Sequence, residues 1–234
     1  MDYGDFSVVL PTLNEERTVG TLIDRLLELY RGIKIVVVDD GSTDGTGRIV
    51  SGISKSNRNV VFVDRKRRGK EKGLTASAVE GVMISKTKFA IIMDADLQHP
   101  PEKIKEIADA LLQNNDIAVA TRADVKGWQL HRKFISKSLI VIGRMILVAR
   151  GRETCSDIFS GFFGIKRGLF SSVYNKNKRR FVGGGYKILF DLLKCIRRDS
   201  VNISEIPYHF GLRSYGKSKA GIRQGVLLFK SFVT

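Results

Sequence analysis

Short apolar runs alternate along the chain with longer segments whose apolar residues recur at helical spacing. The runs are rich in β-branched side chains, which is typical of buried strands, and they occupy residues 6–10, 33–38, 60–63, 89–93 and 117–120. Between them the spacing i, i+3, i+4, i+7 predicts amphipathic helices near residues 14–30, 44–54, 74–85 and 101–111. Apolar strands that alternate with helices indicate an α/β fold with a mostly parallel, twisted sheet flanked by helices.

The first strand and the first helix have recognisable boundary residues. Pro11 cannot donate a ladder hydrogen bond, so we expect it to stop the strand at residues 6–10. Asn14 is a favourable N-cap, and Glu15 and Glu16 would follow it in the first turn, where the helix dipole favours negative charge. The sequence therefore predicts a helix that begins at Asn14.

The character of the sequence changes after about residue 125. Residues 134–148 form a broad apolar surface interrupted by Arg144, and the C-terminal segment places Val226 and Phe229 on one helical face. No apolar run approaches the roughly 20 residues of a membrane span, and no signal peptide is visible at the N-terminus. These segments predict amphipathic helices at a membrane interface or, alternatively, helices buried in the core.

Charge is the unusual part of the composition. The 234 residues include 40 Lys+Arg against 24 Asp+Glu, a net charge of +16, while the 43% hydrophobic content is ordinary for a globular domain. This excess predicts an anionic partner: nucleic acid, anionic lipid or a phosphorylated substrate. Trp128 is the only tryptophan and the basic runs lack flanking aromatics, which favours a membrane surface and phosphates over nucleic acid. Cys155 and Cys195 are too few for a disulfide scaffold and predict reduced thiols in a cytoplasmic protein.

An acidic cluster follows the strand predicted at residues 89–93. Asp94, Asp96 and Gln98 come directly after the strand, and Pro100-Pro101 cannot continue it. Ligands of open α/β sheets bind beyond the carboxyl ends of the strands, and these three side chains offer oxygens suited to a hard divalent cation. The alternative is an acidic strand end that only caps the next helix.

Three further clusters carry polar side chains. Pro11-Thr12-Leu13-Asn14-Glu15 and Val38-Asp39-Asp40-Gly41-Ser42 end two other strands, so we expect them at the same sheet edge. Each alone could be a turn with capping side chains, but together they predict a nucleotide pocket. Residues 213–219 form a basic, glycine-containing loop, either a solvated connector or a flap that brings Arg213 and Lys219 onto phosphates.

These motifs occur in an order that resembles a known family. Pro-Thr-x-Asn-Glu, Val-Asp-Asp-Gly-Ser, Met-Asp-Ala-Asp-Leu-Gln-His-Pro-Pro-Glu, Ser-Gly-Phe-Phe at residues 160–163 and Arg-x-x-Gly-x-Ser-Lys succeed one another from about residue 6 to 220. The chain resembles the family 2 inverting glycosyltransferases of the GT-A (Rossmann-like) fold, and among them the dolichyl-phosphate mannose synthases. The resemblance implies one GT-A domain with two halves: residues 1–125 for nucleotide sugar and metal, and residues 126–234 for the acceptor and the interface helices.

The resemblance also assigns residues to roles. The residues implied for the nucleotide sugar are Pro11, Leu13, Glu15, Val38, Asp39, Asp40, Asp94, Ala95, Lys187, Arg213 and Lys219. Those implied for Mg²⁺ or Mn²⁺ are Asp94, Asp96 and Gln98, and those implied for the lipid phosphate are Arg122, Arg132 and Ser136. Asp96, Arg122 and Arg213 are the implied catalytic residues. Leu13 departs from the family, where an aromatic residue is common at this position.

The implied reaction is transfer of mannose from GDP-mannose to dolichyl or another polyprenyl phosphate, with inversion, at the cytoplasmic face of a membrane. A lipid phosphate is mostly a dianion at neutral pH, so the attacking oxygen needs no general base. Some members carry a transmembrane tail that this sequence lacks, so we expect peripheral attachment to an anionic membrane surface, directly or through a membrane-anchoring partner. The alternatives are a UDP-sugar donor such as UDP-glucose, a non-catalytic nucleotide-binding membrane module and, most remotely, a nucleic-acid binder.

Overall fold

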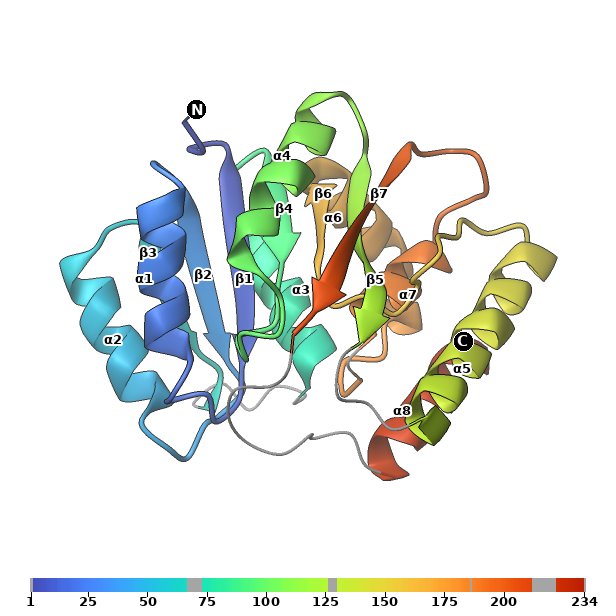
Figure 1. Ribbon diagram of the computed structural model, residues 1–234, viewed down its shortest axis with the longest axis horizontal. Coiled ribbons are helices and arrows are strands. Elements are labelled where there is room, and N and C mark those ends of the chain that lie inside the picture. The colour runs from blue at the N-terminus through green and yellow to red at the C-terminus, as the bar shows by residue number, and fades with distance from the viewer. Residues whose placement is uncertain (1, 67–72, 126–129, 186, 212–221, 234) are drawn as a thin grey trace.

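The computed structural model describes residues 2–66, 73–125, 130–185, 187–211 and 222–233 (Figure 1). These residues form a seven-stranded sheet with strand order β3-β2-β1-β4-β6-β5-β7. The strands are β1 (Phe6–Thr12), β2 (Lys34–Asp39), β3 (Val60–Asp64), β4 (Phe89–Ile92), β5 (Ile117–Val125), β6 (Phe163–Lys166) and β7 (Ile203–Phe210). β1 runs parallel to β2 and β4, β2 to β3, and β5 to β7, whereas β6 is antiparallel to both of its neighbours. The predicted α/β fold with a mostly parallel sheet is confirmed.

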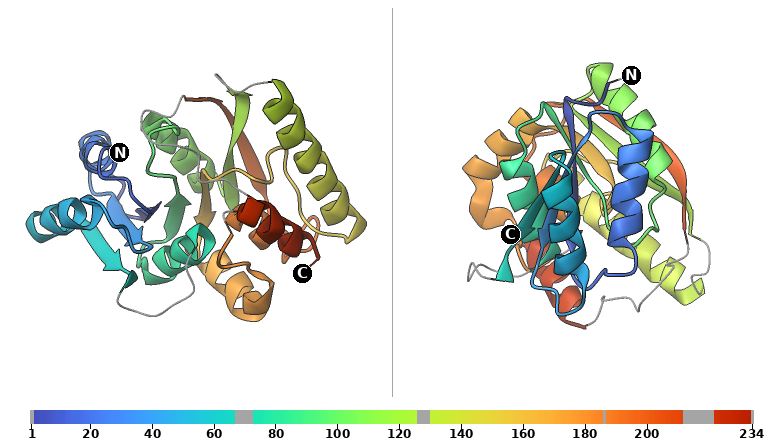
Figure 2. Two further views of the ribbon diagram at one scale, coloured as in Figure 1. Left: turned by 90° about the horizontal axis from the view of Figure 1, so that it is seen from below. Right: turned by 90° about the vertical axis from the view of Figure 1, so that its left-hand side faces the viewer.

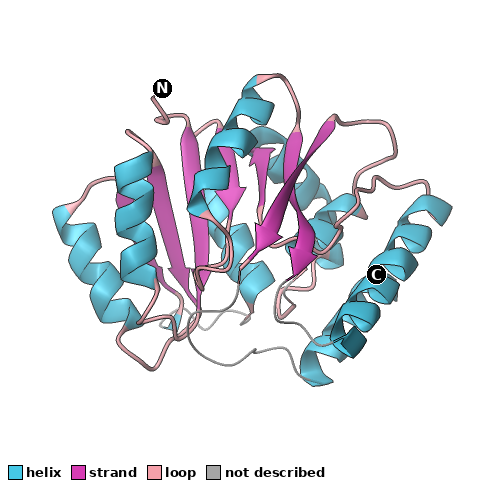
Figure 3. Cartoon of the chain, viewed as in Figure 1, coloured by secondary structure: helices cyan, strands magenta, loops and turns pink. Residues whose placement is uncertain are grey.

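Helices cover both faces of this sheet (Figure 3). They are α1 (Val19–Leu29), α2 (Thr46–Ser56), α3 (Leu74–Ile84), α4 (Ile104–Leu112), α5 (Leu130–Ala149), α6 (Arg167–Asn177), α7 (Ile188–Leu193) and α8 (Ile222–Val233). Two 3₁₀ turns, η2 (Pro101–Lys103) and η3 (Lys178–Arg180), lead into α4 and follow α6. One core lies between the sheet and α1, α2 and α4, and the other between the sheet and α3, α6 and α7.

The central strand β1 illustrates why the strands are apolar throughout. Val8 and Leu10 belong to one core and Val9 to the other, and all three are fully buried. Successive side chains of a strand point to opposite faces, so a strand covered on both sides must be apolar at every position. Cys155 and Cys195 are free thiols, as predicted.

Two predicted boundaries are wrong. β1 continues through Pro11 to Thr12. β4 pairs with β1 only as far as Val9, so no strand on that side needs the N–H group that Pro11 lacks. α1 begins at Val19 with Thr18 as its N-cap, and Asn14 instead has a left-handed φ of 54°. The Asn14 side chain accepts a hydrogen bond from Thr43 N at 2.8 Å, so it joins the two loops that follow β1 and β2.

The predicted amphipathic helices of the second half are present as α5 and α8, which lie at one end of the molecule (Figure 2). They are close to each other, since a Cβ on Gly143 of α5 would lie 3.4 Å from the ring of Phe232 in α8. Both helices also present large apolar side chains to solvent, among them Phe134 (74% exposed), Met145 (67%) and Phe229 (69%). In the described part of the chain, no helix combines the length and apolarity that crossing a membrane requires.

Candidate active site

The loops that follow β1 and β2 are joined by hydrogen bonds at the carboxyl edge of the sheet. Asp40 N donates to Thr12 O at 2.9 Å, and Thr12 Oγ1 donates to Asp39 Oδ2 at 3.0 Å. Glu15 N donates to Thr46 Oγ1 at 2.8 Å, which fixes the start of the α1 loop against α2. Parallel strands end at the same edge, so two of the polar clusters found in the sequence lie side by side.

The two aspartates of the β2 cluster are held by the protein in different ways. Asp39 Oδ1 accepts hydrogen bonds from the Gly41 and Ser42 N–H groups, and Asp39 Oδ2 accepts from the hydroxyls of Thr12 and Ser42. A carboxylate has about four acceptor positions, so the donors of its own turn and of Thr12 in β1 together saturate Asp39. Asp40 is 5% exposed and pairs with Arg65, while its Oδ2 accepts from Gly73 N at 2.7 Å. These aspartates shape the loop in which they lie.

The acidic cluster after β4 forms a tight turn. Leu97 has a left-handed φ of 62°, and Asp96 Oδ1 accepts a hydrogen bond from Gln98 N at 3.1 Å. Gln98 in turn clamps the end of β7: its Nε2 donates to Gly211 O and Gly211 N donates to its backbone oxygen, both at 3.0 Å. The side chain of Asp94 is 44% exposed, whereas Asp96 is 5% exposed. The turn thus presents one accessible and one buried carboxylate beside an amide oxygen.

This donor set fits a hard divalent cation that takes part of its shell from substrate. Over the described ranges, no three His, Cys, Asp or Glu side chains gather into a cage, and Mg²⁺ typically uses one or two carboxylates together with waters and phosphates. Gly161 keeps the space next to the acids open, since a Cβ there would lie 2.9 Å from Asp94 Oδ2. The glycine of the Ser-Gly-Phe-Phe motif therefore lies directly against the carboxylate of Asp94, which any larger side chain would displace.

Arg122 in β5 forms a buried, two-pronged ion pair with Asp157. Its Nε donates to Asp157 Oδ2 at 2.7 Å and its Nη2 to Asp157 Oδ1 at 2.8 Å, and the two side chains are 13% and 7% exposed. Burial acts to raise the pKa of Asp157, but the hydrogen bonds and charge of Arg122 outweigh it, so the pKa lies below its ordinary value. Asp157 is therefore ionised and fixes the orientation of Arg122.

Lys187 brings a second cation to the same place. Its Nζ donates to Phe159 O at 3.5 Å and lies 5.1 Å from the centroid of the Phe159 ring. Burial, followed by the charge of Arg122, lowers the pKa of Lys187 to about 7, against the opposing charges of Asp157 and Asp94. The structure thus brings Asp94, Arg122 and Lys187 within electrostatic reach of one another, although they are distant in the sequence.

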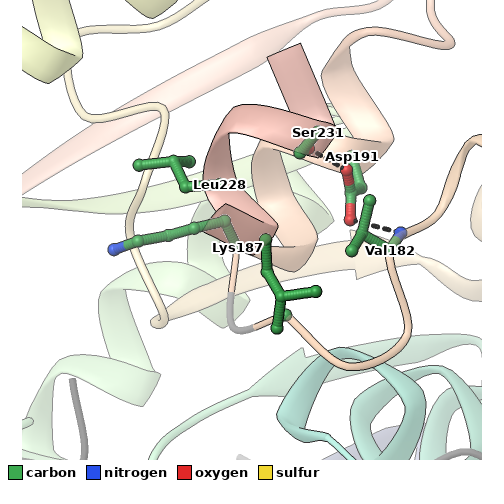
Figure 4. Close-up of a pocket in the computed structure, with 7 residues that line it drawn as sticks. Val182, Lys187, Asp191, Leu228 and Ser231 are labelled. Carbon is green, nitrogen blue, oxygen red and sulfur yellow. Dashed lines mark hydrogen bonds between the residues drawn. The ribbon is translucent and has the colours of Figure 1, made fainter. Parts of the chain in front are cut away.

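The helix that follows Lys187 is tied to α8 by buried polar groups (Figure 4). Asp191 in α7 forms a salt bridge of 2.7 Å with Lys194 and accepts hydrogen bonds from the Ser231 hydroxyl and from Val182 N. Lys194 Nζ also donates to Ser231 O at 3.2 Å. The Asp191 and Lys194 side chains are almost completely buried, so α8 cannot shift without disturbing the helix that positions Lys187.

Other predicted residues are placed only in part. Arg213 and Lys219 lie outside the described residues, Arg132 lies near the start of α5, and Ser136 is half-buried one turn further along that helix. Asp157 was not predicted, although it lies only three residues before Ser160, where the Ser-Gly-Phe-Phe segment begins. The only signal in the sequence was an acidic residue shortly before that motif.

The fold and the order of these motifs define the class. The chain belongs to glycosyl transferase family 2, whose sequence profile matches residues 7–174. The sheet and its helices also resemble the crystal structure of glucosyl-3-phosphoglycerate synthase from Mycobacterium tuberculosis in complex with Mn²⁺, UDP-glucose and phosphoglyceric acid. That likeness has a TM-score of 0.65 at 20% identity and covers 97% of this chain and 76% of the other. The predicted GT-A fold is confirmed.

Curated relatives narrow the comparison. The dolichol-phosphate mannosyltransferase of Pyrococcus furiosus is 35% identical over 219 residues, which cover 91% of this chain and 58% of the relative. The dolichol-phosphate mannosyltransferase of Mycosarcoma maydis is 34% identical over 237 residues, which cover 96% of this chain and 75% of the relative. The chain therefore spans little more than half the length of the first of these relatives and three quarters of the second.

Proposed function

We propose that this protein transfers mannose from GDP-mannose to dolichyl or another polyprenyl phosphate, giving a β-mannosyl phosphate lipid and GDP. The observation that carries the proposal is the meeting of the carboxylates of Asp94 and Asp96 with the cations of Arg122 and Lys187 at one sheet edge. A site of this kind suits two anionic reactants and a metal. The mannosyltransferase names of the relatives support the choice of sugar and acceptor.

The donor diphosphate would lie at the turn after β4. Asp94, Asp96 and the carbonyl oxygen of Gln98 would hold Mg²⁺ or Mn²⁺, and such an ion would act as a Lewis acid on the leaving diphosphate. The Mn²⁺ and UDP-glucose complex of the structural neighbour supports a divalent ion at this step. Lys187 would lie against the same diphosphate, whose negative charge would keep its ammonium group protonated.

The nucleoside would lie over the loops after β1 and β2. Its contacts would come from Pro11, Leu13, Glu15, Val38, Asp40 and Ala95. Asp39 would act mainly by holding its turn, since a ribose hydroxyl could bond to this carboxylate only by replacing one of its present donors. Leu13 would give an apolar contact to the base in place of aromatic stacking.

The acceptor phosphate would be bound from the second half of the chain. Arg122, Arg132 and Ser136 would receive the lipid phosphate, while Arg213 and Lys219 would close over both phosphates. A dianionic phosphate needs no base, and Asp157 would be a poor one, because the ion pair with Arg122 lowers its pKa and engages both of its oxygens. The residues would therefore act by alignment and charge neutralisation in a single in-line displacement with inversion at the anomeric carbon.

The lipid requires that the protein reach a membrane, which we propose occurs peripherally at the cytoplasmic face. The exposed apolar side chains of α5 and α8 and the net charge of +16 would favour an anionic lipid surface. A membrane-anchoring partner would strengthen this attachment. On this proposal, residues 1–125 bind the donor and residues 126–234 bind the acceptor, although both halves contribute strands to one sheet.

Donor competition tests the reaction. Purified protein, dolichyl phosphate in phosphatidylserine-containing liposomes and Mn²⁺ are incubated with radiolabelled GDP-mannose or UDP-glucose, and the lipid product is extracted. The proposal expects label in the lipid from GDP-mannose and a β-linked sugar in its NMR spectrum. Transfer from UDP-glucose and not from GDP-mannose would show that the donor is a UDP-sugar. An α-linked product would exclude a single displacement with inversion.

A matched pair of variants distinguishes an enzyme from a non-catalytic module. Asp96→Asn removes a buried site carboxylate, and Asp24→Asn removes an exposed carboxylate of α1. We expect Asp96→Asn to lower transfer by at least about 1,000-fold while far-UV circular dichroism stays unchanged, because the site loses charge where the leaving group forms. Asp24→Asn should retain wild-type transfer. Equal activity of the two variants would contradict the proposed site.

A further inference from the structure

His99 follows the acidic turn in the sequence and lies beneath it in the structure. It is only 2% exposed, and its ring centroid lies 5.1 Å from that of Phe162 and 5.3 Å from that of Phe210. Nδ1 of His99 is 2.7 Å from the hydroxyl of Tyr208. Nε2 is 3.4 Å from Oδ2 of Asp94, at the long end for a hydrogen bond. The imidazole therefore lies between a phenol in β7 and the exposed carboxylate of the turn.

For a neutral imidazole, the hydrogen-bonding chemistry of the three groups assigns a donor and an acceptor to each contact. An ionised carboxylate only accepts, so Nε2 must carry a proton to bond to Asp94. A neutral imidazole then has a lone pair on Nδ1, and Tyr208 must donate its hydroxyl proton to that lone pair. Burial raises the pKa of Tyr208, so the phenol keeps the proton that it donates. The chain of donors runs from Tyr208 through His99 to Asp94.

We propose that His99 is a positioning residue that holds Asp94 in its metal-binding orientation, with Tyr208 selecting the Nε2–H tautomer. This inference rests on the metal role of Asp94 in the proposed function. Gly161 borders the same carboxylate oxygen, so Asp94 Oδ2 is confined between the imidazole and a backbone that has no side chain. Carboxylates that bind metals are themselves hydrogen-bonded by neighbouring protein groups, whose removal typically weakens metal binding about 10- to 100-fold.

The competing interpretation is a core histidine that merely satisfies its hydrogen bonds. On that interpretation, substitution of His99 changes stability and leaves metal affinity unchanged. The two interpretations are separated by variants that keep the aromatic packing. His99→Phe alone would strand the buried Tyr208 hydroxyl, so it is combined with Tyr208→Phe, because removing both partners of a buried hydrogen bond can be nearly neutral for folding.

The first measurement needs no metal. Long-range ¹H–¹⁵N spectra of the metal-free protein report which ring nitrogen of each histidine is protonated. We expect His99 as the pure Nε2–H tautomer, and a shift towards a mixture of tautomers in Tyr208→Phe. His209, which is exposed and lies next to Tyr208 in β7, gives the reference spectrum for a solvated histidine ring. An Nδ1–H tautomer at His99 in the wild-type protein would overturn the proposal.

The second measurement is Mn²⁺ affinity, followed by electron paramagnetic resonance with and without GDP. We expect the folded double variant, His99→Phe with Tyr208→Phe, to bind Mn²⁺ about 10- to 100-fold more weakly, and His99→Gln, which restores an N–H donor, to recover part of the loss. His209→Gln should bind as the wild type does. If the double variant binds Mn²⁺ as tightly as the wild type, the positioning role of His99 is refuted but the metal site is not. If the wild-type protein does not bind Mn²⁺ at all, both the metal site and the role of His99 are refuted.

Discussion

The ion pair between Arg122 and Asp157 allows a quantitative test of how the site is held together. Asp157→Asn keeps the size of the side chain and removes its charge, which leaves the Arg122 guanidinium in a site where only 13% of its side chain is exposed. Two charge-assisted hydrogen bonds, of 2.7 and 2.8 Å, are weakened at once. Breaking a buried pair by removing one partner costs about 3–5 kcal/mol, a large share of the stability of a typical domain.

Urea unfolding followed by far-UV circular dichroism measures this loss. The matched control is Asp109→Asn, which breaks an ion pair of 2.7 Å with Lys105 on the surface of α4, where the side chains are 36% and 65% exposed. That exposed pair should contribute little, because solvent screens it, so Asp109→Asn should unfold close to the wild-type midpoint. The double variant Arg122→Met with Asp157→Leu should recover most of the loss, because apolar groups of similar volume commonly replace a buried pair without cost.

The pH dependence follows from the lowered pKa of Asp157. The folded protein holds this carboxyl ionised where the unfolded chain would already protonate it, so its contribution is present above about pH 4 and disappears as the pH falls through the folded value. The difference between the wild type and Asp157→Asn should therefore shrink below pH 4. A loss no larger than that of Asp109→Asn, or a difference that persists undiminished in acid, would refute this account of the pair.

Four other substitutions have outcomes that the structure specifies. Lys187→Met should stabilise the protein at pH 6–7, because the pKa of Lys187 is lowered to about 7 in the folded protein. The wild type loses this penalty only as the pH rises from there towards about 10.4, the pKa of an unfolded lysine. Urea midpoints at pH 6, 8 and 10 measure the effect, and equal midpoint shifts at all three pH values would contradict it. Ser231→Ala removes a donor to a buried carboxylate and should cost about 1–3 kcal/mol in the same assay; a loss near zero would mean that α8 is not fixed by this bond. Phe134→Ser and Phe229→Ser should each weaken co-sedimentation with anionic liposomes about tenfold, because each removes an exposed apolar side chain from α5 or α8. Val61→Ser, in the edge strand β3, should have no effect. Equal binding of all three variants to the liposomes would exclude α5 and α8 as the lipid-facing surface.

The sheet could be predicted from the sequence where its strands are buried on both sides, because such strands have no alternative to unbroken apolar runs. β6 could not be predicted in this way. It is only four residues long, includes Gly164, and is held by pairing with β4 and β5, which are remote in the sequence. Nothing local to Phe163–Lys166 specifies an antiparallel direction, since that is decided by where the chain enters from α5.

The site was predictable to the extent that its residues follow strands directly. Asp94 and Asp96 lie at the sheet edge because the end of β4 places them there, whereas the partnership of Arg122 with Asp157 depends on a contact across 35 residues of chain. The two interpretations of Asp39 were alternatives in the sequence. The structure shows that Asp39 accepts hydrogen bonds within its own turn, which could be counted only once the backbone was known, while its contact with a nucleoside stays a prediction.

The reversed direction of β6 decides which residues can reach the reactants. In a strand that ran parallel to β4 and β5, the loop before it would emerge at the opposite edge of the sheet. For the four residues of Phe163–Lys166, at about 3.3 Å per residue, that edge is about 13 Å away. Because β6 enters from the other end, Asp157 and Gly161 arrive beside Arg122 and Asp94 before the strand begins. Because β6 alone runs in the opposite direction, the residues that precede β6 meet the residues at the carboxyl ends of β4 and β5 in one site.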